Sequence, residues 1–212
     1  MNPIPDQMID RWANRVDQKP GEGRIYWHIL LGQYPEAVAL AREAQRRLEP
    51  FRDGLHMTPL EWLHITIHIA GPADRISQEQ IQQMTEIAER MLAGTPPITI
   101  TLGRILYHRE AIMLAADPAE ALWPVVSAAR NATQQIAGKT RYSGNNQSSV
   151  PHATVCYSTQ PQPRGPITGT LGWYLPTSTC VIRSINLINQ HGPERDWNWI
   201  PLTSMIWTNT GM

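Results

Sequence analysis

Cysteine is scarce in this chain, which has only Cys156 and Cys180 among its 212 residues. Two cysteines are too few for a disulfide-stapled scaffold, and their spacing matches no zinc-binding pattern. The sequence also lacks a basic start followed by an apolar run, and no uncharged apolar stretch reaches the ~20 residues of a membrane helix. We therefore expect a cytoplasmic protein with no signal peptide and no membrane partner.

An excess of charge of one sign is absent as well. Lys and Arg total 18 and Asp and Glu total 18, so the formal net charge is zero. Proteins that coat duplex DNA normally carry a strong basic excess, so this balance argues against duplex DNA as a partner. Hydrophobic residues make up 42% of the chain and charged residues 17%, which allows a sizeable core and excludes a disordered chain.

No glycine-rich phosphate loop follows a predicted strand, and strands and helices do not alternate regularly, which excludes a doubly wound parallel sheet. Runs of β-branched and aromatic residues predict strands, and apolar residues at helical spacing predict helices. The predicted fold class is α+β with largely antiparallel sheets. The strands cover 25–31, 63–69, 98–107, 111–115, 152–157, 180–189 and 200–207, and the helices cover 35–50, 78–92 and 117–137, with one short helix within 160–176.

Two of the predicted strands carry the same short pattern, a histidine and a threonine separated by one apolar residue. The first copy is 64–66 (His-Ile-Thr), and the second, 152–154 (His-Ala-Thr), begins 88 residues later. Side chains at i and i+2 of a strand point to the same face, so each histidine shares a face with its threonine. One copy alone would be weak support for a site, but two copies in equivalent strands indicate an internal duplication around a shared cleft.

The four polar residues of these motifs suit acid–base chemistry at a phosphodiester. Opening a cyclic phosphate needs one group that takes a proton from water and one that protonates the departing ribose oxygen. Histidine can do either near neutral pH, so we expect His64 and His152 to be the catalytic pair, with base and acid unassigned. Thr66 and Thr154 would donate hydrogen bonds to the phosphate oxygens as negative charge develops there.

The paired motifs resemble those of the 2H phosphoesterase superfamily, which includes 2′-5′ RNA ligases and cyclic phosphodiesterases. That family carries two His-x-Thr/Ser motifs, each followed by an apolar residue, here Ile67 and Val155. The order of predicted elements is also similar, over roughly residues 24–207. The resemblance implies a bilobal fold, in which two antiparallel sheets related by pseudo-twofold symmetry surround a central cleft, with helices on the outer faces.

The resemblance also implies a domain organisation and a function. Residues 1–23 are interpreted as an N-terminal extension with at most one short helix, and 24–212 as a single domain of two interwoven lobes. The expected activity is metal-independent cleavage of a 2′,3′-cyclic phosphate or a 2′-5′ linked nucleotide or RNA end, by a monomer with no cofactor. Two alternatives stay open: hydrolysis of cyclic di- or oligonucleotide signals, and a non-catalytic nucleotide- or RNA-binding module.

Three further residues are assigned to the cleft by their positions. His68 lies four residues after His64, so strand alternation directs it into the cleft as a phosphate or ribose contact, the alternative being a solvated strand residue. Tyr26, on the first predicted strand, either stacks on a base or belongs to the core. Cys156 is placed on the cleft side by the same alternation, but it has no activating base and is not expected to be a nucleophile.

Overall fold

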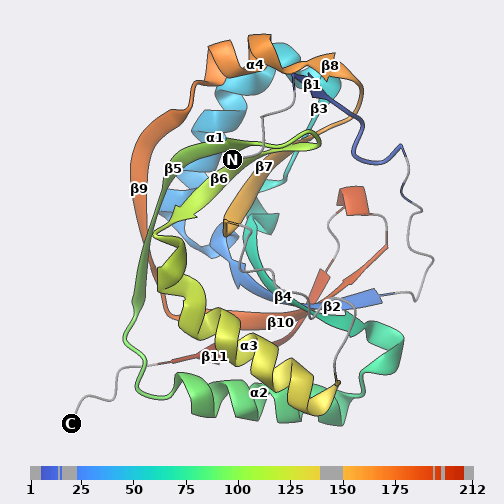
Figure 1. Ribbon diagram of the computed structural model, residues 1–212, viewed down its shortest axis with the longest axis vertical. Helices are drawn as coiled ribbons and strands as arrows, with labels where there is room; N and C mark the ends of the chain where they lie inside the picture. Colours follow the sequence, from blue (N-terminus) through green and yellow to red (C-terminus); the bar gives the residue numbers. More distant parts are fainter. Residues whose placement is uncertain are drawn as a thin grey trace.

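The computed structural model describes residues 6–13, 15, 23–138, 150–192, 194–196 and 199–207. Within these residues, four α-helices and a large antiparallel sheet form an α+β fold (Figure 1), so the predicted fold class is confirmed. None of the described helices is both long and apolar enough to cross a membrane. The helices are α1 (Pro35–Leu48), α2 (Gln78–Leu92), α3 (Trp123–Ile136) and α4 (Arg164–Leu171).

The main sheet has nine strands in the order β11-β10-β2-β4-β7-β6-β5-β9, with the short β3 paired to β7. A separate two-stranded sheet pairs β1 (Gln7–Met8) with β8 (Gln162–Pro163). The strands of the main sheet are β2 (Gly23–Leu30), β3 (Leu55–Met57), β4 (His64–Pro72), β5 (Ile98–Tyr107), β6 (Ala111–Asp117), β7 (His152–Ser158), β9 (Tyr174–Ile182), β10 (Ser184–His191) and β11 (Trp199–Ile206).

The structure has one main sheet where two were expected. The halves β11-β10-β2-β4 and β7-β6-β5-β9 are joined between β4 and β7, and Ile65 and Ala153 form the only residue pair of that junction among the described residues. Both are the middle residues of a His-x-Thr motif. The expectation of two separate sheets is therefore corrected, because the two motif strands pair with each other, and the symmetry between the halves stays a prediction.

The helices begin largely where the sequence predicts. Pro35 is the first residue of α1. Its fixed φ suits the first turn, and its missing N–H costs nothing there because the first N–H groups of a helix have no acceptor within the helix. The Ser77 hydroxyl accepts a hydrogen bond from the Gln80 N–H, and the Gln80 side chain accepts one from the Ser77 N–H, so the predicted capping box of α2 is confirmed. The helix predicted from residue 117 begins only at Trp123, after a short 3-10 turn over Ala119–Leu122.

The single strand predicted at 180–189 covers the end of β9 and most of β10. β9 ends at Ile182 and pairs with β5, whereas β10 begins at Ser184 and pairs with β2 and β11. These partners lie in opposite halves of the sheet. Apolar residues continue on both sides of Arg183, so the hydrophobic pattern gives no sign that the chain changes partners there.

The described part of the N-terminal extension contains no helix. Beyond β1, Ile9 N–H donates to the carbonyl of Arg109 and Arg11 N–H donates to the carbonyl of Ser158, which fastens this segment to the β5–β6 turn and the end of β7. Trp12 is 7% exposed and packs in a small apolar cluster with Tyr157 and Trp199. The segment is thus part of the folded body, and the other residues of 1–23 lie outside the described residues.

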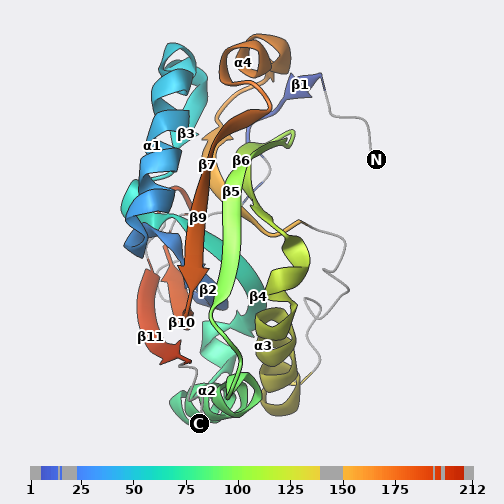
Figure 2. The same cartoon turned by 90° about the vertical axis from the view of Figure 1, so that its left-hand side faces the viewer.

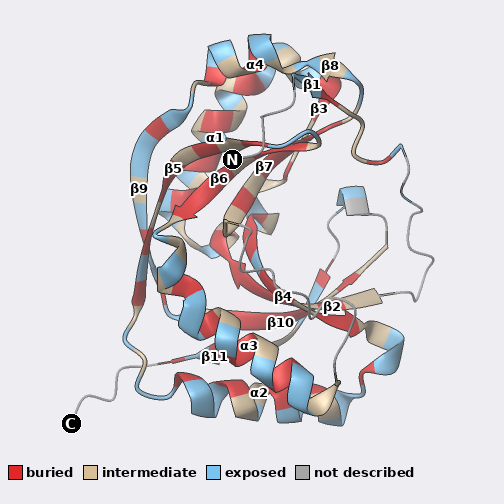
Figure 3. Ribbon diagram, in the orientation of Figure 1, coloured by how far each residue is buried: buried red, intermediate tan, exposed pale blue. Residues whose placement is uncertain are grey.

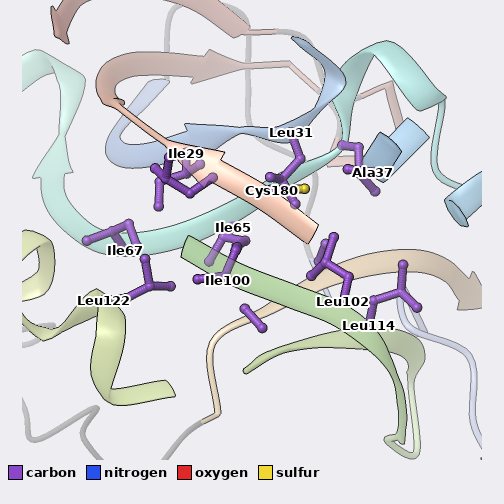
Figure 4. Packing of buried hydrophobic residues seen from close by; sticks show 14 of the residues in the cluster. Ile29, Leu31, Ala37, Ile65, Ile67, Ile100, Leu102, Leu114, Leu122 and Cys180 are labelled. Atoms are coloured by element: carbon purple, nitrogen blue, oxygen red, sulfur yellow. The ribbon is translucent and has the colours of Figure 1, made fainter. Parts of the chain in front are cut away.

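One hydrophobic cluster unites both halves of the sheet. Figure 4 shows Ile65 of β4 beside Ile100 of β5, and the same cluster includes Ile29 of β2 and Leu114 of β6. Helices α1 and α4 lie at one end of the molecule and α2 and α3 at the other (Figures 1 and 2). Figure 3 shows buried residues along the strands and exposed residues on α2 and α3. The shared core holds the two motif strands in a fixed relation.

Candidate active site

A cleft of about 590 Å³ lies over the β4–β7 junction. Its wall contains the two histidines and two threonines that the motifs predict as the site. The strands β4 and β7 are antiparallel, and Ile65 pairs with Ala153. The residues on either side of this pair therefore also lie next to each other, His64 alongside Thr154 and Thr66 alongside His152. The described lining residues are Arg11, Arg15, Arg24, Tyr26, His28, His64, Thr66, Ile69, Leu106, His108, Ala111, Met113, Val150, His152, Thr154, Tyr157 and Gln190.

Both motif histidines are held by the same backbone contact. His64 Nδ1 lies 2.8 Å from the carbonyl oxygen of Trp62, and His152 Nδ1 lies 2.8 Å from that of Val150, in each case two residues earlier. A carbonyl oxygen can only accept, so each Nδ1 carries a proton and donates it. In the neutral ring, Nε2 is then the basic nitrogen that exchanges protons.

Burial keeps His64 uncharged near neutral pH. Its side chain is 8% exposed, and desolvation lowers its pKa to about 4, with the nearby charge of His152 adding to the effect. The hydrogen bond to the Trp62 carbonyl opposes this shift and is outweighed. His152 is only partly buried. The two imidazoles are therefore in unequal surroundings, and the His64 ring is neutral near pH 7.

His28 is a site residue that the sequence analysis missed. It is 1% exposed, and its ring stacks on that of His64 with centroids 4.2 Å apart and planes at 16°. Its Nε2 lies 3.2 Å from the Thr66 hydroxyl oxygen. Burial, and secondarily His64, holds the pKa of His28 well below its usual value. The signal that could have found it is alternation, since Tyr26 and His28 are polar at alternate positions of an otherwise apolar strand.

Basic residues also line the cleft without having been predicted. Arg11 and Arg15 arrive from the N-terminal segment and are both ion-paired with Glu110, at 2.9 and 3.0 Å. Arg24 comes from β2, and His108 comes from the β5–β6 turn. No Asp or Glu is among the described lining residues, and the lining arginines outnumber the one carboxylate, Glu110, that pairs with two of them. The lining is therefore positive although the whole chain has zero net charge. Such a lining favours an anionic ligand.

Tyr26 lies in the wall of the cleft, is partly buried, and packs against the small apolar cluster that contains Trp199. Its ring is tilted against that of His28, with centroids 5.1 Å apart, and its hydroxyl lies 3.4 Å from Arg24 Nη1. Stacking of a base on Tyr26 stays a prediction.

His68 does not line the cleft, contrary to the alternation argument. The β2–β4 register shifts by one residue after Thr66, so that Ile67 is an extra residue and His68 pairs with Trp27. A bulge of this kind reverses the faces of the residues that follow it. Ile69 therefore reaches the cleft, while His68 is 4% exposed on the same side as the buried Trp27.

The second motif is followed by the same irregularity. The β6–β7 register shifts after Thr154, which leaves Val155 as the extra residue. Tyr157 then lines the cleft, whereas Cys156 is fully buried and does not line it, which corrects its expected position. Burial raises the pKa of the Cys156 thiol to about 12, so this group is inert near neutral pH. In both copies the apolar residue after the threonine is the bulged one.

Replacing His68 with leucine is expected to protect the protein against acid without a loss of activity. Burial, and then the charge of Arg130, lowers the pKa of His68 from 6.5 to about 4. A lowered pKa means that the unfolded chain binds the proton first, so stability is lost as pH falls from about 6.5 towards 4. In His68→Leu the free energy of unfolding should fall by roughly 3 kcal/mol less between pH 7 and pH 4 than in the parent.

Urea denaturation of His68→Leu and the parent at the two pH values measures this difference directly. An equal acid-induced loss in both proteins would show that His68 is not buried as a neutral ring.

Fold and cleft together define an α+β protein with two His-x-Thr strands meeting at a basic cleft. The chain belongs to the 2′-5′ RNA ligase superfamily, whose family model matches residues 32–194. The resemblance drawn from the two motifs is thereby confirmed. A comparison with curated proteins finds no match.

Solved structures share this fold at low sequence identity. TT0787 of Thermus thermophilus has a TM-score of 0.66 at 18% identity, covering 89% of this chain and 100% of its own. A structure described as a phosphoesterase gives 0.59 at 17%, covering 90% and 99%. LigT of E. coli in its apo form gives 0.57 at 16%, covering 88% and 98%. At sequence identities this low, the structural similarity shows a shared fold and nothing more.

Proposed function

We propose that this protein is a metal-independent phosphodiesterase that opens 2′,3′-cyclic phosphates or cleaves 2′-5′ linked nucleotides or RNA ends. The observation that carries the proposal is the matched pair His64 and His152, each held through Nδ1 by the carbonyl two residues earlier and both lining one basic cleft. Binding alone does not need two acid–base groups in such an arrangement. This favours an enzyme over a non-catalytic binding module.

The lowered pKa of His64 makes it the base of the proposed reaction, which leaves His152 as the acid. His64 is neutral at pH 7 and takes a proton from water through Nε2, and the water oxygen bonds to phosphorus. The bond from phosphorus to one ribose oxygen breaks, and His152 gives that oxygen its proton, which leaves a phosphomonoester. Thr66 and Thr154 donate hydrogen bonds to the non-bridging oxygens as their charge grows. The roles of the histidines exchange when the reaction runs backwards as ligation.

The cleft and its relatives support a nucleotide as the substrate. A volume of about 590 Å³ lies in the range of small-molecule sites, and the arginine lining suits phosphate groups. Structures of E. coli LigT contain 3′-AMP, ATP or NADP+. Their common feature is a nucleotide that carries phosphate.

A panel of substrates tests the proposal. Nucleoside 2′,3′-cyclic phosphates, 2′-5′ and 3′-5′ dinucleotides and cyclic dinucleotides are each incubated with the protein, and the products are separated by chromatography. We expect turnover of the 2′,3′-cyclic phosphates or of the 2′-5′ dinucleotides. Exclusive turnover of cyclic dinucleotides would assign the cleft to signal hydrolysis, and binding without any turnover would make the protein a binding module.

Activity is expected to survive EDTA, because two imidazoles supply both proton transfers. Among the described residues, no group of three or more His, Cys, Asp or Glu side chains is placed to hold a metal ion. Initial rates with and without excess EDTA should agree within about two-fold. Complete loss of activity that a divalent ion restores would replace the two-histidine scheme with a metal-assisted one.

The pH profile should report the lowered pKa of the base. Since His64 must be neutral to accept a proton, kcat/KM should stay high as pH falls through 6.5 and decline only near its pKa of about 4. The profile should also decline at high pH, when the acid loses its proton, and so be bell-shaped. Circular dichroism at each pH controls for unfolding. An acid limb with a midpoint between 6 and 7 would contradict the assignment of His64 as base.

A further inference from the structure

The cleft contains a further histidine that the two-motif scheme does not use. His28 lies directly opposite Thr66 in the β2–β4 register, and its Nε2 is 3.2 Å from the Thr66 hydroxyl oxygen. Its ring also stacks on His64 and meets the ring of Trp199 edge-on, with centroids 5.5 Å apart. His28 therefore contacts two of the four motif residues and is fixed in place by its neighbours.

The contact between His28 and Thr66 can be made in two ways with opposite consequences. If Nε2 carries the proton, the ring donates to the threonine oxygen, and the threonine keeps its own hydrogen for another acceptor. If Nδ1 carries the proton, Nε2 accepts the threonine hydrogen, and the hydroxyl has nothing left to donate. The tautomer of one buried ring thus decides whether Thr66 can act on a substrate.

The surroundings of Nδ1 select the first arrangement. This atom is buried and has no hydrogen-bond partner among the residues that the structure describes. An N–H group buried without an acceptor is more costly and rarer than a buried lone pair without a donor. The proton is therefore on Nε2, which donates to Thr66. Burial also lowers the pKa of His28, so the ring makes this bond in its neutral form.

We propose that His28 is a positioning residue, which turns the hydroxyl hydrogen of Thr66 towards the non-bridging phosphate oxygen of the substrate. The inference rests on the proposed phosphodiesterase function. It adds that His28 orients the Thr66 hydroxyl before negative charge develops on the phosphate oxygen. A preorganised donor needs no reorientation when charge develops, which is how such donors accelerate a reaction.

The second motif has a different partner at the equivalent position. The residue paired with Thr154 on the neighbouring strand is Met113, whose thioether has no hydrogen to donate. The two threonines are thus unequal although the motifs are alike. Thr154 provides an internal control, because a residue that acts through Thr66 should not depend on it.

A double-mutant cycle tests the coupling. His28→Phe keeps an aromatic ring against His64 but removes the donor, and His28→Gln keeps a donor but removes the ring. We expect His28→Phe to lower kcat about 10-fold with KM changed less than two-fold, and His28→Gln to recover most of that loss. In a Thr66→Val background, His28→Phe should have less than a two-fold effect, whereas in Thr154→Val the 10-fold effect should persist.

A purely structural role predicts the opposite pattern. Phenylalanine would then be tolerated better than glutamine, and the effect of His28→Phe would be the same in both threonine backgrounds. Either result would overturn the proposal. Melting temperatures of all variants separate loss of fold from loss of rate.

The tautomer itself can be read without any substrate. Nitrogen-15 NMR of the imidazole rings in the unliganded parent protein should show His28 protonated at Nε2 only. Protonation at Nδ1 would overturn the proposal even if the protein turns over cyclic phosphates. If the protein turns over nothing while His28 is the Nε2–H tautomer, the proposed function fails and the His28–Thr66 bond stands.

Discussion

His64→Ala and His152→Ala are each expected to lower kcat by about 10²-fold or more while the protein stays folded. Each change removes one of the two proton transfers, together with the ring that a backbone carbonyl holds in place through Nδ1. Steady-state kinetics on a 2′,3′-cyclic phosphate, with circular dichroism of each variant, measures the effect. His191→Ala is a suitable control, because this histidine is not among the described residues that line the cleft.

The two single variants should also differ in their pH profiles. Loss of His64 should remove the acid limb, since that limb reports the base. Near-parental turnover in either variant would contradict a mechanism that needs both histidines.

The threonines should tolerate serine and not valine. Serine keeps the hydroxyl at Thr66 and Thr154, so both Thr→Ser changes should be mild. Valine keeps the shape but loses the donor, which should cost roughly 2–4 kcal/mol of transition-state stabilisation, about 30- to 10³-fold in kcat/KM. The measurement is kcat/KM for all four variants on one cyclic phosphate.

The order of the two substitutions separates catalysis from packing. A threonine that only stabilises a strand is replaced at least as well by valine as by serine, because β-branched side chains suit strands. Harmless valine substitutions at both positions would therefore remove the threonines from the mechanism.

Which side chains of each motif share a face could be predicted from the sequence, because that depends only on local alternation. The shared cleft was predicted from the repetition of the motif and the family resemblance. Within residues 64–66 and 152–154, i and i+2 share a face, and the structure has all four polar side chains in the cleft wall. Beyond each threonine, alternation failed. Bulges at Ile67 and Val155 turn His68 and Cys156 away from the cleft, and a bulge depends on the pairing of two strands rather than on one strand's own pattern.

Other parts of the site could not be found locally because distant segments contribute them. Arg11 and Arg15 reach the cleft only because the N-terminal segment docks on the β5–β6 turn. Alternation with Tyr26 could have placed His28 on the cleft face of its strand, but its position opposite Thr66 follows only from the β2–β4 register. The division into β9 and β10 has the same origin, since partner choice is a tertiary property.

The central claim is that two histidines open a phosphodiester without a metal. Phosphorus NMR of a nucleoside 2′,3′-cyclic phosphate, incubated with the parent protein in excess EDTA, tests it most directly. The account predicts that the cyclic phosphate resonance is replaced by that of a single phosphomonoester, and that a variant with both His64→Ala and His152→Ala leaves it unchanged. A cyclic phosphate that persists with the parent, or that disappears equally fast with the double variant, would contradict the account.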